Sequence, residues 1–279
     1  MRLGDFQHRA KNTLGMTPHP ISRVINAERI VLLGWSRAIL LQLAHPLVAA
    51  GVAEHSTFRE GRLAAAVRLH HTVRAMLALT FGDERSRTAA VEGIKAIHRR
   101  VHGHLPSAAG TFPAGTWYSA EDPELVLWVH ATLLDSVPMI YDLTVAPLAV
   151  GDRDAYCAQA APLAVDLGAR DADVPRTWRA LQDYLSAMYG SGRIAVSGQA
   201  REIASAVVAP PLAFVLGPVT WANRLVTEGL LPPAVRSGYG AAWNEDRERA
   251  LRRTIAAIRR LRRWTPPALA LWPEARSRQ

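Results

Sequence analysis

Along most of this 279-residue chain, apolar residues recur at steps of three and four, the spacing that gathers them on one face of an α-helix. This spacing predicts helices over 28–44, 47–55, 60–81, 83–102, 123–137, 151–167, 175–189, 197–209, 220–230 and 245–263. No stretch alternates apolar and polar residues convincingly, as a half-buried strand would. We therefore expect an all-α fold, built as a bundle of many helices.

Two helix starts are marked by good capping residues. Asp83 precedes one predicted helix, and the run Asp122-Pro123-Glu124 precedes another. An aspartate can accept hydrogen bonds from the free N–H groups of a first turn, and proline suits the first helical position. The helix that begins at Pro123 is apolar nearly all round, so we expect it at the centre of the fold.

Composition favours one domain with one core, since 49% of the residues are hydrophobic and no flexible linker or repeat interrupts them. We expect residues 1–24 to form a tail and residues 25–245 the catalytic domain. Residues 246–279 should add a basic amphipathic helix and a tail that pack on the same domain. A single cysteine, Cys157, and no apolar run of signal-peptide length near the N-terminus favour a cytoplasmic location.

The net charge of +9 is concentrated at one end. Residues 245–279 hold ten arginines against four acidic residues. Within this segment Leu251, Ile255, Ile258 and Leu261 have helical spacing, so one face can dock while arginines cover the other. We expect a solvated outer face, with peripheral contact to an anionic membrane surface, such as the inner membrane face, or to a partner as the alternative. No nucleic-acid recognition pattern accompanies the charge.

All ten histidines lie in the first 130 residues. Imidazole is the side chain that most often binds metals and moves protons near neutral pH, so chemistry is expected in this half. His98 shares a helical stripe with Val91, Ile94 and Val101 and should therefore face the core. There it needs a metal, a carboxylate or a carbonyl as partner. On a helix continuing to residue 102, His102 follows one turn later on the same side.

Arg68 and Thr72 are four residues apart on one helical line. An arginine on a line of small and apolar residues suggests a buried anion, either a neighbouring carboxylate, a phosphate or the propionate of a cofactor. The simple alternative is an ion pair with an acid of the next helix. His71, beside Thr72, faces the same cavity or is half-exposed.

Further histidines carry weaker signals. His45 follows a fully apolar helix and should be buried. Glu54 next to His55 could serve proton transfer, or be a capping acid beside a surface imidazole. His130 lies in the apolar helix that begins at Pro123. We expect it to be a hydrogen-bonded core histidine, or a residue that positions a side chain of the site. His104 is given no role.

Three stretches together resemble the family of latex-clearing protein (rubber oxygenase) and the mycophenolate-pathway oxygenase MpaB. They are ILLQLAHPLVAAGVAEHSTF at 39–58, RLHHT at 68–72 followed by IKAIHRRVHG at 94–103, and YSAEDPELVLWVHATLLDS at 118–136. The resemblance covers roughly residues 25–245. The third stretch is the most distinctive, because an Asp-Pro-Glu cap before a WVHATL core is unlikely to recur by chance.

This resemblance implies an all-α fold, globin-like in class, that encloses a haem b pocket. It implies dioxygen chemistry on a hydrophobic small molecule. His98 would be the proximal haem ligand, and Arg68 and Thr72 would match the family's Arg-x3-Thr pair at the haem. His102 stands where the family commonly has arginine, and with His130 it would complete the cofactor surroundings.

On the distal side the resemblance leaves three candidates for catalysis. His71 is an additional imidazole that could approach or bind the iron, Thr72 lies beside it, and Glu54 could be the acid–base residue near bound oxygen.

Two other functions compete with a haem oxygenase. The first is a zinc or non-haem iron enzyme that uses His98, His102 and one of His45, His55 or Glu54; the chain has no HExxH, paired-cysteine or GxSxG motif to supply another template. The second is a haem-binding sensor or carrier without catalytic activity.

Overall fold

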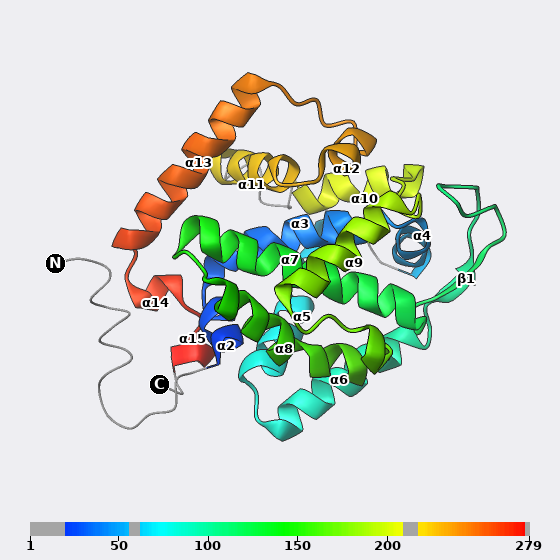
Figure 1. Cartoon of the computed structure of the whole chain (residues 1–279), viewed down its shortest axis with the longest axis horizontal. Coiled ribbons are helices and arrows are strands. Elements are labelled where there is room, and N and C mark those ends of the chain that lie inside the picture. Colours follow the sequence, from blue (N-terminus) through cyan, green and yellow to red (C-terminus); the bar gives the residue numbers. More distant parts are fainter. Residues whose placement is uncertain (1–19, 56–61, 209–216, 277–279) are drawn as a thin grey trace.

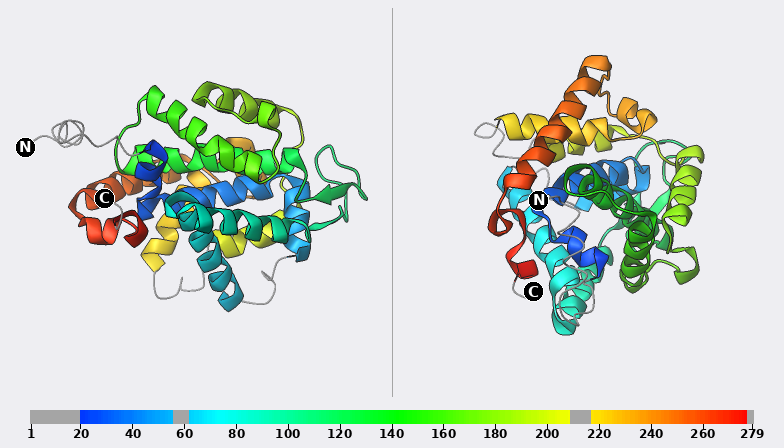
Figure 2. Two further views of the ribbon diagram at one scale, coloured as in Figure 1. Left: turned by 90° about the horizontal axis from the view of Figure 1, so that it is seen from below. Right: turned by 60° about the vertical axis from the view of Figure 1, so that its left-hand side comes forward.

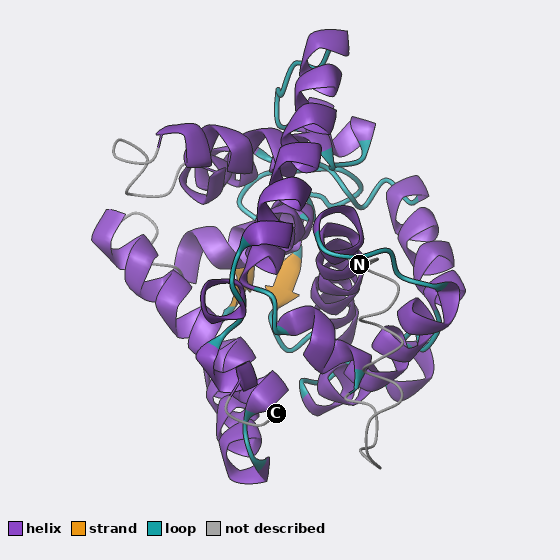
Figure 3. Ribbon diagram, turned by 90° about the vertical axis from the view of Figure 1, so that its left-hand side faces the viewer, coloured by secondary structure: helices purple, strands orange, loops and turns teal. Residues whose placement is uncertain are grey.

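The fold is described by a computed structural model, in which residues 20–55, 62–208 and 217–276 are placed. These residues form fourteen α-helices, two 3-10 helices and one two-stranded hairpin. Figure 1 shows helices packed around a central pair, with the hairpin at one end of the molecule, and Figure 3 shows how small the strand content is. The all-α part of the prediction is confirmed apart from this hairpin.

The elements follow one another along the chain with short connections. Those in the first half are α2 (Ile21–Asn26), η1 (Arg29–Val31), α3 (Leu32–Leu43), α4 (Pro46–His55), α5 (Arg62–Phe81), α6 (Glu84–His98), β1 (His102–His104), β2 (Trp117–Ser119) and α7 (Pro123–Thr144). Those in the second half are α8 (Val150–Asp166), η3 (Asp171–Asp173), α9 (Trp178–Gly190), α10 (Gly198–Val208), α11 (Gly217–Gly229), α12 (Pro233–Gly238), α13 (Glu245–Trp264), α14 (Pro267–Ala270) and α15 (Pro273–Arg276).

Helices α3 and α7 form the centre of the molecule. Gln42 of α3 donates a hydrogen bond to Thr132 of α7, while Arg37 reaches Ser136, so the two helices run antiparallel. Their close approach depends on Gly34, where an added Cβ would lie 2.7 Å from the carbonyl oxygen of Ser136. As expected from its apolar surface, α7 is buried along most of its length.

Both predicted caps are confirmed. The Asp83 carboxylate accepts a hydrogen bond from the Ser86 N–H at 2.8 Å, and the Asp122 carboxylate accepts one from the Glu124 N–H at 2.8 Å. Helix α7 continues past the predicted end at residue 137 and through Pro138. Proline removes one backbone donor at that point, and the packing of α7 in the core compensates for the loss.

The predicted helix over 83–102 is too long. Helix α6 ends at His98, and His102 lies instead on strand β1, which pairs antiparallel with β2 in the register His102 to Ser119. The stretch between the two strands connects them without regular structure of its own. The hairpin projects from the end of the molecule opposite α14 and α15 (Figure 2), so His102 does not continue the helical stripe of His98.

The basic helix α13 is amphipathic as predicted. Leu251 is buried and contacts the apolar cluster around Leu225 and Val226 of α11, with Ile255 and Ile258 packed beside it. Leu261 was expected on this docking face but is 69% exposed. The inward position of that turn belongs to Arg262, whose Nε donates to the buried Glu28 carboxylate at 2.6 Å.

No single helix of the placed residues is long and apolar enough to cross a bilayer. The segments 29–43 and 46–55 reach the required length only when taken together, and the chain bends by 104° between them. Most of α3 and much of α4 are buried in the core.

Candidate functional site

His98 is the last residue of α6 and is half-buried. Its Nδ1 is shielded from solvent and makes no hydrogen bond to any residue that the structure places. Burial lowers the pKa of the imidazole below 6.5, and the nearby Glu121 carboxylate only partly opposes this shift. At pH 7 the ring is therefore neutral and keeps a lone pair for a ligand.

Helix α5, which carries Arg68, His71 and Thr72, packs against α6. The backbone of Arg68 lies within α5, but its side chain falls outside the described part of the structure. His71 and Thr72 are exposed. The structure thus places the helix of the predicted Arg-x3-Thr pair beside the helix of His98.

Glu54 and His55 end helix α4, next to the hairpin. The buried Tyr118 of β2 donates its hydroxyl to the Glu54 carboxylate, and burial together with this carboxylate raises the pKa of Tyr118 well above 10. The Nε2 of His55 lies 3.0 Å from the carbonyl oxygen of His102. A carbonyl can only accept, so this nitrogen carries the proton.

Gly103 of β1 lies directly against the Tyr118–Glu54 pair. A Cβ on Gly103 would lie 2.7 Å from the Tyr118 oxygen and 3.0 Å from the carboxylate oxygen of Glu54. Any side chain at this position would push the pair apart. Sequence reasoning did not identify Tyr118, since its partner is 64 positions away; the tyrosine that opens the distinctive third stretch was the available signal.

His102 and His104 are exposed on β1 and flank Trp117 of β2. The His102 ring stacks on the indole at 5.4 Å between centroids, and the His104 ring meets its edge at 5.0 Å. His102 therefore leaves the helical stripe that was predicted to hold it near His98.

Two further imidazoles are sealed inside the protein. His45 is fully buried as predicted, neither of its ring nitrogens has a partner among the placed residues, and Phe112 covers it at 5.2 Å between centroids. His130 is also buried, and its Nε2 lacks the hydrogen bond that we expected from a placed group. Burial lowers the pKa of His45 to about 3 and that of His130 to about 4, so both rings are neutral.

Asp135, the acid nearest to His130 along the sequence, is engaged elsewhere. It forms a buried ion pair with Arg37 at 2.7 Å. Across residues 20–55, 62–208 and 217–276, no three histidine, cysteine or carboxylate side chains come together closely enough to hold a metal ion. The triad of His98, His102 and a third ligand is therefore not assembled in this part of the chain.

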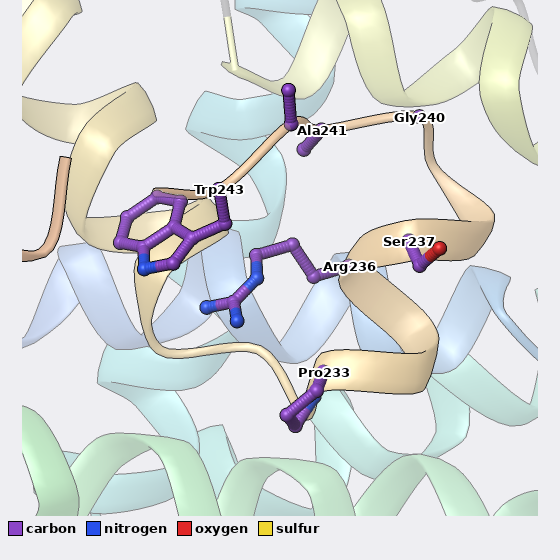
Figure 4. A pocket seen from close by; sticks show the side chains of 7 residues that line it. Pro233, Arg236, Ser237, Gly240, Ala241 and Trp243 are labelled. Atoms are coloured by element: carbon purple, nitrogen blue, oxygen red, sulfur yellow. The ribbon is translucent and has the colours of Figure 1, made fainter. Parts of the chain in front are cut away.

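An open hollow of about 410 Å³ lies at α12 and the loop that follows it (Figure 4). Its side chains include Arg236 and Trp243, with the Arg236 guanidinium 4.5 Å from the indole centroid. None of the residues predicted for the site lines this hollow. It lies in the second half of the chain, away from the histidine-rich segments.

Comparison with known proteins identifies a protein family. The family described as "ER-bound oxygenase mpaB/B'/Rubber oxygenase, catalytic domain" matches residues 22–260. The chain is also similar to uncharacterized proteins of Mycobacterium tuberculosis and Mycobacterium bovis. Each is 26% identical over 232 residues, which cover 82% of this chain and 87% of the relative. No solved structure matches the chain significantly.

Proposed function

This chain belongs to the mpaB and rubber oxygenase catalytic-domain family, and from that premise we propose that it is a b-type haem-dependent oxygenase acting on a hydrophobic small molecule. Membership confirms the resemblance seen in the sequence, and it identifies the chain as an enzyme of oxygenase type. The haem, the substrate class and the roles of individual residues are our proposal.

The observation that carries the proposal is the state of His98. Its ring is neutral, half-buried and without a hydrogen-bond partner on the shielded Nδ1. A histidine that binds haem iron must have a neutral imidazole, and a buried ring nitrogen without a partner calls for one. The donor at position 98 therefore fits the group that the family membership implies. When bound, haem supplies an iron centre at which dioxygen is activated.

The neighbouring helix α5 would meet the second requirement of a haem site. A haem brings two anionic propionates, which cations and hydroxyl donors hold. In our proposal Arg68 and Thr72 hold this edge, and the packing of α5 on α6 supports it. His71 occupies the position next to Thr72, from which an imidazole on the distal side would compete with dioxygen.

Glu54 is proposed to handle protons near bound oxygen. Its carboxylate accepts the hydroxyl hydrogen of Tyr118, which limits how far the side chain can rotate. A carboxylate held in one place transfers protons along a fixed direction. Glu54 remains exposed, so water can exchange protons with it.

The decisive experiment is the absorption spectrum of the purified full-length chain, before and after haem addition, with the pyridine haemochrome as a second readout. We expect a Soret band and one haem per chain. His98→Ala should weaken haem binding by at least about tenfold, since it removes the proximal ligand. His104→Ala is the matched control: it deletes an exposed imidazole of β1 and should leave haem content unchanged.

Four results would contradict the proposal. The first is a protein without a Soret band after haem addition, and the second is a His98→Ala variant with full haem content. Zinc or iron found without porphyrin would favour the non-haem enzyme. A stable six-coordinate haem that turns over no apolar substrate with dioxygen would favour a sensor or carrier, and loss of the sixth ligand in His71→Ala would identify its source.

A further inference from the structure

Three large apolar side chains are exposed where α13 ends and α14 begins. Leu261 is 69% exposed, Trp264 81% and Leu269 65%. Single exposed apolar residues are common on proteins, but these three lie within nine positions of one another. Pro266, Pro267 and Ala268 between them are exposed as well. We call residues 253–269 the basic-aromatic tip.

Of the arginines in this tip, Arg262 pairs with the buried Glu28, whereas four others have no acidic partner among the placed residues. Arg253, Arg259, Arg260 and Arg263 are exposed and form no ion pair with any residue that the structure places. No aspartate or glutamate occurs between Arg249 and Pro273.

The first half of α13 is different. There Arg247 pairs with Glu228 at 2.7 Å, and the guanidinium of Arg249 pairs with Asp246 and Glu245. Acidic side chains therefore neutralise Arg247 and Arg249 near the start of the helix, whereas Arg253, Arg259, Arg260 and Arg263 further along have no such partner among the placed residues.

The charged and apolar side chains share one outer face. At 100° per residue, Arg253, Arg260 and Trp264 fall on one line of α13, opposite the inward side chains of Leu251 and Ile255. Figure 1 shows α13 along the margin of the molecule and its end leading into α14. The outer face of the tip is thus open to a flat partner.

We propose that the basic-aromatic tip docks this protein on the surface of an anionic phospholipid bilayer. Arginines beside exposed tryptophan and leucine are the combination that binds at the headgroup level, with the ring at the boundary and the cations on lipid phosphates. A second copy of the chain that docked through its own tip would bring a surface of the same charge against this one, and such like-charge contacts are costly. The proposal does not depend on haem, so the two fail independently.

The test is sedimentation of the full-length protein with vesicles of phosphatidylcholine alone and of phosphatidylcholine with phosphatidylglycerol. We expect binding only to the anionic vesicles, weakened by added salt. Arg260→Gln with Arg263→Gln should weaken it about 25-fold, at about fivefold for each arginine. Trp264→Ser should weaken it on the order of tenfold and abolish the blue shift of tryptophan emission on binding. Arg262 is left intact because it holds Glu28.

The controls change residues of the same chemistry outside the tip. Arg179→Gln alters an exposed arginine of α9, and Val150→Ser an exposed valine of α8; both should bind vesicles like the unaltered protein. The proposal is overturned by absent vesicle binding, by equal binding to both vesicle types, or by full binding in the tip variants. It is also overturned if the tip variants lose only self-association or only binding to duplex DNA.

Discussion

The buried ion pair between Arg37 and Asp135 offers a sharp test of how the central helices are held together. Both side chains are nearly inaccessible, and the Arg37 Nη1 lies 2.7 Å from Asp135 and 2.6 Å from the Ser136 hydroxyl. Nε of Arg37 donates to the Leu230 carbonyl at 2.8 Å, and Gln182 donates to Asp135 at 3.2 Å. The network thus connects α3, α7, α9 and the end of α11.

Replacing Asp135 by alanine leaves the Arg37 charge in the core without its counter-ion. We expect a loss of about 3–5 kcal/mol in the free energy of unfolding, because water cannot reach the buried guanidinium to solvate its charge. For a chain of 279 residues, 4 kcal/mol corresponds to a fall of about 7 °C in Tm. Urea denaturation followed by circular dichroism measures the first quantity, and a thermal scan the second.

The double variant Arg37→Met with Asp135→Leu is the matched comparison, since it removes both charges and keeps most of the volume. It should be less destabilised than Asp135→Ala alone, as paired removal of a buried ion pair is often close to neutral. A loss below 1 kcal/mol for Asp135→Ala would refute the reasoning. So would a double variant that is less stable than the single one.

Two further predictions concern buried histidine and close helix packing. The pKa of His45 is about 3 in the fold and about 6.5 when unfolded, so its contribution to stability is complete above pH 6.5 and is lost as the pH falls. Between pH 7.5 and pH 5.0 the protonation of this residue in the unfolded chain should lower the free energy of unfolding by about 2 kcal/mol. In His45→Phe, urea titrations at the two pH values should lack this part of the difference in the free energy of unfolding. Gly34→Ala should lower the free energy of unfolding by about 1–3 kcal/mol, because its Cβ meets Ser136. Gly93→Ala, in open space on α6, should raise it by about 1 kcal/mol, and thermal scans compare the two variants.

The helical part of this fold could be predicted because its signals are local. The central helix α7 combines a capping aspartate, a proline at the first position and an apolar surface, and each acts within a few residues of chain. The amphipathic helix α13 was predictable for the same reason, up to Leu261. Leu261 lies beside the face of α13 that packs on the protein. Arg262 points inward in its place because it pairs with Glu28, which is distant in sequence.

The hairpin could not be predicted because each strand has only three residues, too few for alternation to show. Its effect on the site is large, since it removes His102 from the helix of His98. Tyr118 could not be predicted because its role depends on a hydrogen bond to Glu54, which lies on a different element, helix α4. Contacts between elements far apart in sequence leave no periodic trace, so the site could be predicted by residue type but not by arrangement.

The buried polar groups of this protein differ in whether they have hydrogen-bond partners, and this difference separates the histidines from the central ion pair. Arg37 and Asp135 are buried with full sets of partners, as a stabilising network requires. His45, His98 and His130 each keep a buried ring nitrogen without a placed partner, which is costly unless something else occupies it. His45 and His130 are sealed, so a cofactor could reach them only by opening the core. His98 is half-exposed at the end of α6, so part of its ring, unlike those of His45 and His130, is in contact with solvent. Of these three histidines, only His98 combines a partly exposed ring with a buried nitrogen that has no placed partner. This combination makes it the best candidate for a ligand-binding histidine.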